Sequence, residues 1–130
     1  MVYIVDDDLS VRTNLARLMR SAGLAAQVFA SAEDFLAAAD TLELGCLLLD
    51  ITLPGASGHQ LQAELKRRQI NLPVIAVSAR DEDDTRDLAR QLGARYFFRK
   101  PVDAQALLDA IEWVQEPKAR KAAQPGNADW

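Results

Sequence analysis

Short apolar segments alternate along the chain with longer segments whose apolar residues recur at every third or fourth position. The short runs, rich in Val, Ile, Leu and Phe, predict strands over residues 2–6, 25–30, 45–50, 73–78 and 95–98. The longer segments predict helices over residues 9–22, 31–40, 59–69, 83–92 and 103–115. The pattern therefore repeats a strand followed by a helix five times.

This alternation predicts an α/β fold built on a single parallel sheet. Parallel neighbours need a crossover connection, and helices that supply it cover both faces of the sheet. The runs 45–50 and 73–78 are apolar almost throughout, which is typical of central strands, whereas 25–30 is more polar, as expected at a sheet edge. Right-handed crossovers bring the carboxyl ends of all strands to one edge, where open α/β sheets bind their ligands.

Polar and charged residues stand at four of these carboxyl ends. They are, in chain order, Asp6, Asp7, Asp50, Ser78 and Lys100. Nothing comparable ends the strand 25–30. We therefore expect three carboxylates, a hydroxyl and an ammonium group, remote from one another in the chain, to converge in one crevice.

Converging carboxylates call for a cation. Two of them roughly 4 Å apart repel each other by about 4 kcal/mol at an effective dielectric constant near 20, so the site must raise a carboxyl pKa or bind a positive ion. Magnesium fits best because it prefers oxygen ligands and often shares its coordination with phosphate. No cysteine or histidine ends a strand, which argues against a transition metal. The single histidine, His59, stands at the start of a predicted helix and is interpreted as a surface residue.

A carboxylate, magnesium, a hydroxyl and a lysine together predict a phosphoryl-transfer site. Asp50 is the expected nucleophile because it ends a central strand and leads into the glycine-rich loop 53–58. We expect Ser78 to hydrogen-bond the transferred group and Lys100 to neutralise the charge on its oxygens.

Composition narrows the setting of this site. The chain has 130 residues, about half of them hydrophobic, and a formal net charge of −4, which suits one globular domain and argues against direct binding of nucleic acid. Cys46 is the single cysteine, so no disulfide can form within the chain and a cytoplasmic location is expected. Residues 1–8 show neither the basic region nor the long apolar stretch of a signal peptide or membrane anchor, and none is expected.

Four motifs, in order and each at a strand end, resemble the receiver domain of bacterial two-component response regulators, in the style of the FixJ/LuxR class. They are VDDD (5–8), LLLDITLPGASG (47–58), VIAVSA (74–79) and GARYFFRKP (93–101). The resemblance covers residues 2 to about 115. It implies a flavodoxin-like, doubly wound fold with five helices and the strand order 2-1-3-4-5, for which a relative of this family is a reference example.

The resemblance implies a role for each matching residue at the metal site. Asp50 matches the phosphoacceptor aspartate. Asp7 matches the direct magnesium ligand and Asp6 its acidic neighbour, while Asp50 and the backbone carbonyl of Thr52 complete the protein's contacts with Mg²⁺. Thr52 and Arg80 also flank the site, where we expect them to tune the lifetime of the acyl phosphate.

A second group of residues matches the conformational switch of the family. Ser78 takes the place of the switch hydroxyl that moves toward the phosphoryl group, and Lys100 that of the lysine that pairs with it. The Lys100–Pro101 peptide is then expected to be cis, which is accessible at low energy only before proline. Phe97 matches the switch aromatic that turns inward. Val102 stands where many relatives have Phe, and Arg99 where many have an aliphatic or acidic residue.

The resemblance also implies partners and a domain organisation. A histidine kinase or phosphotransfer protein would donate the phosphoryl group, and phosphorylation would favour a homodimer. Trp113 lies off the apolar stripe of its predicted helix, and we expect it in or beside that association surface. Residues 1–116 would form the receiver domain and residues 117–130 a flexible linker or tail, leading to a DNA-binding output domain outside this chain. Transcription would then be controlled through that domain, with no turnover of an external substrate and no membrane contact.

Other interpretations remain at this point. Asp8 is interpreted as the cap of the first helix in preference to a metal ligand, and the acidic run 81–84 as the start of a helix, stabilised by its dipole. Asp6 and Asp8 also resemble the nucleophile motif of haloacid-dehalogenase-type phosphatases, but that interpretation leaves Asp50 without a role. A flavodoxin-like electron carrier lacks its phosphate loop after the first strand. A receiver-like interaction module that is never phosphorylated is the more serious alternative.

Overall fold

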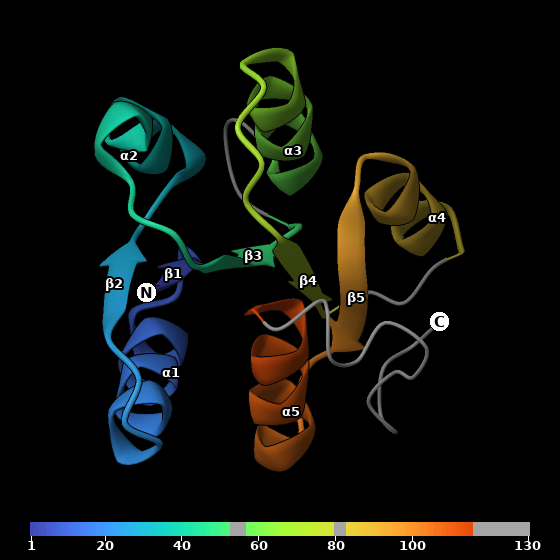
Figure 1. Ribbon diagram of the computed structural model, residues 1–130. Coiled ribbons are helices and arrows are strands. Elements are labelled where there is room, and N and C mark those ends of the chain that lie inside the picture. Colours follow the sequence, from blue (N-terminus) through green and yellow to red (C-terminus); the bar gives the residue numbers. More distant parts are fainter. Residues whose placement is uncertain (53–56, 80–82, 116–130) are drawn as a thin grey trace.

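The computed structural model describes residues 1–52, 57–79 and 83–115, and within them five strands and five α-helices alternate (Figure 1). The strands are β1 (Val2–Val5), β2 (Ala26–Phe29), β3 (Cys46–Asp50), β4 (Val74–Ser78) and β5 (Ala94–Arg99). The helices are α1 (Leu9–Ser21), α2 (Ala32–Ala37), α3 (Gly58–Arg67), α4 (Asp83–Gln91) and α5 (Ala104–Gln115), with a short 3₁₀ helix, η1 (Ala39–Thr41), after α2. The predicted alternation is confirmed.

All five strands form one parallel sheet in the order β2-β1-β3-β4-β5. Every residue of the central strands β1, β3 and β4 is buried, whereas β2, at one edge, is partly exposed. The reversal of strand order lies between β1 and β3, so the carboxyl ends of these two strands border the crevice expected for a doubly wound fold.

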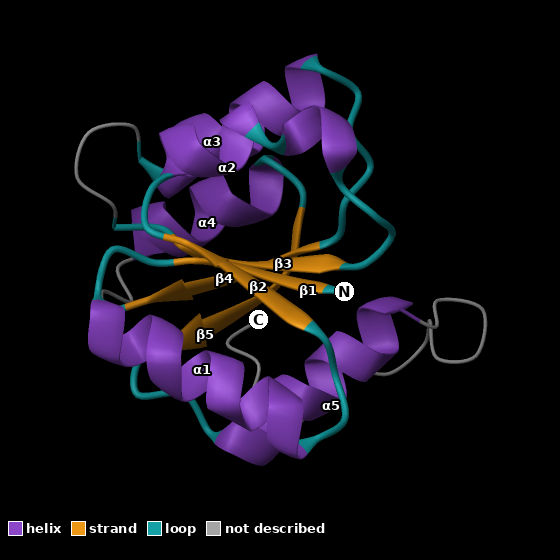
Figure 2. Ribbon diagram, turned by 90° about the vertical axis from the view of Figure 1, so that its left-hand side faces the viewer, coloured by secondary structure: helices purple, strands orange, loops and turns teal. Residues whose placement is uncertain are grey.

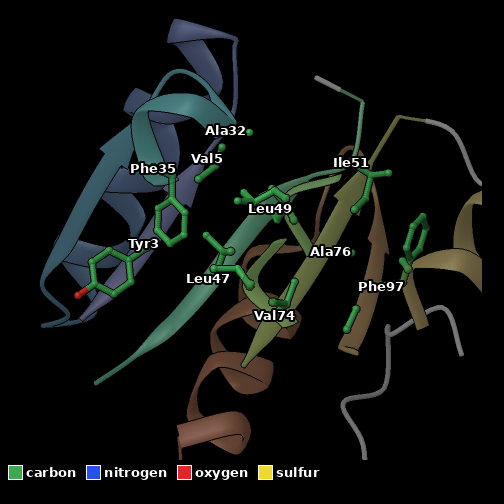
Figure 3. Close-up of a cluster of buried hydrophobic side chains, with 14 residues drawn as sticks. Tyr3, Val5, Ala32, Phe35, Leu47, Leu49, Ile51, Val74, Ala76 and Phe97 are labelled. Atoms are coloured by element: carbon green, nitrogen blue, oxygen red, sulfur yellow. The ribbon is translucent and has the colours of Figure 1, made fainter. Parts of the chain in front are cut away.

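The helices form two layers, one on each face of the sheet. Figure 2 shows α2, α3 and α4 on one face and α1 and α5 on the other. Strand residues alternate between the two layers: Tyr3 and Val5 pack with α2, α3 and α4, whereas Val2 and Ile4 pack with α1 and α5. The same alternation directs Phe97 toward the layer of α2, α3 and α4. All residues labelled in Figure 3, Phe97 included, belong to the apolar cluster on that face.

Local hydrogen bonds explain where three helices begin. Asp8 caps α1 by accepting from the backbone N–H groups of Ser10 and Val11, which confirms its interpretation as a cap. Ser31 caps α2 in the same way. Ser57 and Gln60 form a reciprocal capping box at the start of α3.

Helix boundaries differ from the sequence prediction mainly after Ser31. The helix predicted over 31–40 ends at Ala37, because the Ala38 N–H bonds the carbonyl of Phe35, only three residues back, and the chain continues as the 3₁₀ turn η1. The third helix ends at Arg67, two residues early, and Gln69 adopts a positive φ of 59°. Other boundaries move by one or two residues. No helix in the described part of the chain is long and apolar enough to cross a membrane.

Candidate functional site

Lys100 joins two buried carboxylates at the carboxyl edge of the sheet. Its Nζ lies 2.8 Å from Oδ2 of Asp6 and 3.1 Å from Oδ2 of Asp50. These residues are 94 and 50 positions away in the chain, yet Asp6 follows β1 directly and Asp50 ends β3. The predicted convergence of strand ends therefore occurs at this point.

Asp6 is held from several sides. It is 1% exposed, and its Oδ1 accepts a hydrogen bond from the backbone N–H of Asp8 at 2.9 Å. Its backbone carbonyl accepts from Nη1 of Arg12, on the second turn of α1, at 2.8 Å. Both oxygens of the carboxylate are thus engaged, one by the start of α1 and the other by Lys100.

Asp50 is also buried, at 4% exposed, and it lies beside two hydroxyl groups. Its Oδ1 accepts from the backbone N–H of Thr52 at 2.9 Å and lies 3.4 Å from the Thr52 hydroxyl. That hydroxyl is 3.3 Å from Oγ of Ser78, which is fully buried at the end of β4. Thr52 itself is exposed, so this residue lies between the buried Asp50 and solvent.

Burial and neighbouring charges shift the pKa values of Asp50 and Lys100. Desolvation raises the pKa of Asp50 above its ordinary value, the charge of Asp6 raises it further, and the Thr52 N–H and Lys100 oppose both. Burial alone lowers the pKa of Lys100, but the hydrogen bond to Asp6 and the charges of both carboxylates outweigh burial, so that its pKa is raised. Lys100 is therefore a fixed positive charge beside a carboxylate that gains from any additional cation.

The backbone of β5 places Lys100 in the site. The Lys100 N–H donates to the carbonyl of Ser78 at 2.8 Å, which continues the pairing of Ser78 with Arg99 in the sheet. The Lys100–Pro101 peptide bond is cis, as expected from the resemblance.

Three carboxylates form a cluster suited to a hard cation. One ligand oxygen from each of Asp6, Asp7 and Asp50 lies within 4.8 Å of the others, and Asp7 contributes from the exposed side. An all-oxygen donor set open to solvent on one side fits Mg²⁺, which keeps part of its water shell. Asp8 does not belong to the cluster, because its carboxylate caps α1.

A model of the response regulator receiver domain family matches residues 2–112. The chain belongs to this family. It is 38% identical over 125 residues to Nodulation protein W of Bradyrhizobium diazoefficiens, covering 95% of this chain and 55% of that protein. It is also 38% identical over 110 residues to the transcriptional regulatory protein FixJ of Azorhizobium caulinodans, covering 85% of this chain and 52% of that protein.

Solved structures agree with this assignment. The crystal structure of FixJ-N matches with a TM-score of 0.84 and 35% identity, over 88% of this chain and 92% of that one. The predicted family and its strand order are therefore confirmed, and the receiver domain is a module of phosphorylation-dependent two-component signalling. The phosphatase and electron-carrier alternatives are not favoured by these matches. The chain spans about half the length of the curated relatives it matches.

Phe97, the expected switch aromatic of the receiver domain, is fully buried. It packs in the apolar cluster that includes Ala89 of α4, and Figure 3 shows its ring on the α4 side of the sheet. The sequence interpretation has this ring turn inward upon phosphorylation. Here it already occupies an inward position, so that its role as a mobile switch stays a prediction. Trp113, on α5, is half-buried, less exposed than its place off the apolar stripe suggested.

Two features of the receiver site escaped the sequence analysis. Thr52 was assigned a backbone carbonyl at the metal, whereas its hydroxyl also links Asp50 to Ser78; a polar residue two positions after Asp50 was the available signal. Arg12 was not considered, although an arginine one turn after the Asp8 cap can reach the end of β1.

Other predicted residues are placed only in part. His59 was interpreted as a surface residue, but it is half-buried and its Nδ1 atom is fully buried. Asp83 and Asp84 lie exposed in the first turn of α4, as expected of helix-starting acids. Arg80, the acids at 81–82, most of the loop 53–58 and the linker 117–130 lie outside the described residues.

Proposed function

We propose that this receiver domain takes a phosphoryl group onto Asp50 from a phosphohistidine and thereby changes the surface that controls an output. The proposal depends above all on one observation, the Lys100 ammonium within hydrogen-bonding distance of both Asp6 and Asp50. A cation fixed between the carboxylates of Asp6 and Asp50 is suited to hold the oxygens of a group transferred to Asp50.

Asp50 is the nucleophile in this proposal. One of its carboxylate oxygens attacks phosphorus, the P–N bond of the phosphohistidine breaks, and the imidazole of the donor leaves with the bonding electrons and takes up a proton. Thr52 orients the carboxylate through its backbone N–H, and Lys100 holds the second oxygen. Asp50 is preferred to Asp6 because it is the residue that matches the phosphoacceptor aspartate of the receiver domain family.

Magnesium is the proposed cofactor. Asp6, Asp7 and Asp50 would hold it with the Thr52 carbonyl, and the bound ion supplies charge neutralisation for the phosphoryl oxygens. Asp7 is the natural direct ligand because its carboxylate is exposed, whereas that of Asp6 is occupied by Lys100. The chain itself places the three carboxylates of Asp6, Asp7 and Asp50 close together, with the Lys100 ammonium beside two of them.

We expect the hydroxyl of Ser78 to donate a hydrogen bond to an oxygen of the phosphoryl group on Asp50. Its Oγ is 3.3 Å from the Thr52 hydroxyl, which itself contacts Asp50. When Ser78 turns to donate to a phosphoryl oxygen, its contact with Thr52 is lost and the packing beside Phe97 adjusts. A few charge-assisted hydrogen bonds to a dianion are enough to shift an equilibrium between two states.

The wider context follows from the relatives. FixJ is described as a transcriptional regulatory protein about twice the matched length, so we infer a cytoplasmic regulator in which residues 1–116 receive the signal. A histidine kinase or phosphotransfer protein would supply the phosphoryl group, and a DNA-binding domain beyond the linker 117–130 would respond. Dimerisation upon phosphorylation, with Trp113 near the contact, completes the proposal. The domain would turn over no substrate other than its own phosphate.

The test is labelling with acetyl phosphate, a small phosphodonor, with and without Mg²⁺. Wild-type protein should gain one phosphoryl group, seen by intact-mass spectrometry, only with Mg²⁺, and Asp50→Asn should gain none. Asp8→Asn is the matched control, since asparagine also caps helices and the variant should label normally. Full labelling of Asp50→Asn, or steady hydrolysis of a stable phosphate ester by the wild type, would rule the proposal out.

A further inference from the structure

Gln62 carries an unusual polar contact between two helices of the same layer. It lies on α3, is 2% exposed, and its Nε2 donates a hydrogen bond of 3.0 Å to the backbone carbonyl of Ala89 in α4. Ala89 stands in the last turn of α4, where carbonyl groups lack partners within the helix. The Gln62 side chain therefore caps the carboxyl end of a neighbouring helix.

This contact falls on the residue that anchors α4. Ala89 is the buried residue of α4, at 0% exposed, whereas Leu88 beside it is 40% exposed. In Figure 2, α3 and α4 lie in one layer on the same face of the sheet. A helix with so little buried surface depends strongly on each specific bond that fixes its position.

The opposite end of α3 is seated against the phosphoacceptor strand. Gly58, its first residue, donates its N–H to the carbonyl of Ile51, the residue after Asp50. A Cβ at Gly58 would lie 2.6 Å from Cα of Ile51 and 2.7 Å from the carbonyl oxygen of Asp50, so that only glycine permits this approach. The start of α3 is therefore fixed closely to the backbone at Asp50 and Ile51.

His59 follows Gly58 and lies one turn before Gln62 on α3. Nδ1 of His59 and Oε1 of Gln62 are both buried without a hydrogen-bond partner among the described residues. The two residues are three positions apart on α3, a spacing that puts their side chains on the same side of the helix. A neutral imidazole protonated on Nδ1 would donate to Oε1 of Gln62, satisfy both atoms and orient the Nε2 group toward Ala89.

We propose that Gln62 is a positioning residue that restrains α4 on α3, with its amide oriented by His59. The contacts Asp50–Ile51, Gly58–His59, Gln62 and Ala89 form a continuous route from the phosphoacceptor to α4. The restraint itself is independent of phosphorylation. Its use as part of the switch, released when Asp50 is phosphorylated, depends on the proposed function.

The test is hydrogen exchange of the full chain, comparing Gln62→Met with the wild type. Methionine keeps the side-chain length but cannot donate to Ala89, so amide exchange in 83–91 should quicken about five-fold while α5 is unchanged. Gln91→Met, an exposed glutamine on α4, is the matched control and should leave exchange unaltered. His59→Leu should produce a smaller rise, about two-fold, and no rise would remove His59 from the proposal.

Two results would overturn the role of Gln62. One is α4 exchange in Gln62→Met within a factor of 1.5 of the wild type; the other is an equal rise in α4 and α5, which indicates general destabilisation. If Gln62→Met does not fold, Gln62→Leu serves instead, since leucine is also apolar, fills most of the same space and cannot donate to the Ala89 carbonyl. Acetyl phosphate treatment should change amide exchange in α4 of the wild type. In Gln62→Met this phosphorylation-dependent change should be about five-fold smaller, although Asp50 is still labelled. An undiminished change contradicts the switch role, whereas absent labelling of the wild type contradicts only the proposed function.

Discussion

The two helices that flank β5, α4 and α5, are held to the sheet in very different ways. α5 buries five residues, Ala106, Leu107, Ala110, Ile111 and Val114, in the core that it shares with α1. α4 buries Ala89, and its next apolar residue, Leu88, is 40% exposed. The two helices are of similar length, so the difference lies in their sequences rather than in their size.

This difference assigns the two helices different tasks. Apolar burial fixes α5 to the sheet over its whole length, which makes α5 part of the stable support of the domain. α4 contributes only Ala89 to the buried apolar cluster among its described residues and receives a hydrogen bond from Gln62, so less apolar burial opposes its movement. A helix that moves when Asp50 is phosphorylated should be one with little buried apolar surface, such as α4. A difference of a few kcal/mol between two states cannot displace a fully packed helix such as α5.

Cys46 offers the largest test of how firmly the α5 face is closed. It is fully buried, burial raises the pKa of its thiol to about 11, and its Sγ lies 3.5 Å from Nε2 of Gln115 at the end of α5. We expect a thiol reagent to react with native protein at least about a thousand-fold more slowly than with urea-unfolded protein, because reaction requires unfolding. Rapid labelling without urea would show that α5 opens by itself.

Ile111→Ala should cause the next largest change. The side chain is 1% exposed within the α5 core, and its truncation leaves a cavity that lowers the free energy of unfolding by about 3 kcal/mol. The matched change on the other face, Leu88→Ala in α4, should cost less than about 0.5 kcal/mol. Urea denaturation followed by circular dichroism measures both. Equal losses in the two variants would contradict the contrast between the helices.

How far the sequence predicts this contrast depends on the kind of interaction. Apolar periodicity located α5 and its buried residues, and the residues at strand ends predicted the convergence of Asp6, Asp50 and Lys100, because parallel topology leaves few alternatives. Gln62 could not be predicted as buried, since a polar residue next to an apolar stripe is normally solvated.

Side-chain contacts across elements were the least accessible. The link from Thr52 to Ser78 joins the segment after β3 to the end of β4 through atoms whose directions depend on the backbone turn after Asp50. The inward position of Phe97 likewise reflects packing beneath α4, which no local pattern records. His59 was misjudged because the sequence shows its place at a helix start and not the neighbour that covers its ring.

The raised pKa of Asp50 makes the stability of the domain depend on pH. Its pKa is raised mainly by burial, so the folded state binds a proton more tightly than the unfolded state does. Stability therefore falls as pH rises from the ordinary carboxyl pKa through the raised pKa of the folded state, and above that window the penalty is complete. The raised pKa of Lys100 acts only at alkaline pH, where stability is lost as pH rises through it.

Asp50→Asn should thus stabilise the domain, by about 1 kcal/mol at pH 7 in the presence of a metal chelator, the smallest of these effects. Asparagine keeps the acceptor for the Thr52 N–H but removes the buried charge that repels Asp6. This gain in the free energy of unfolding should vanish near pH 3, where Asp50 is protonated in both the folded and the unfolded state. It should become smaller when Mg²⁺ is added, because the ion stabilises the wild type. Asp87→Asn, an exposed change on α4, serves as the control in thermal unfolding and should leave stability unaltered. If the gain were the same at pH 3 and pH 7, its origin would be packing rather than charge, and burial would not be what destabilises the Asp50 carboxylate.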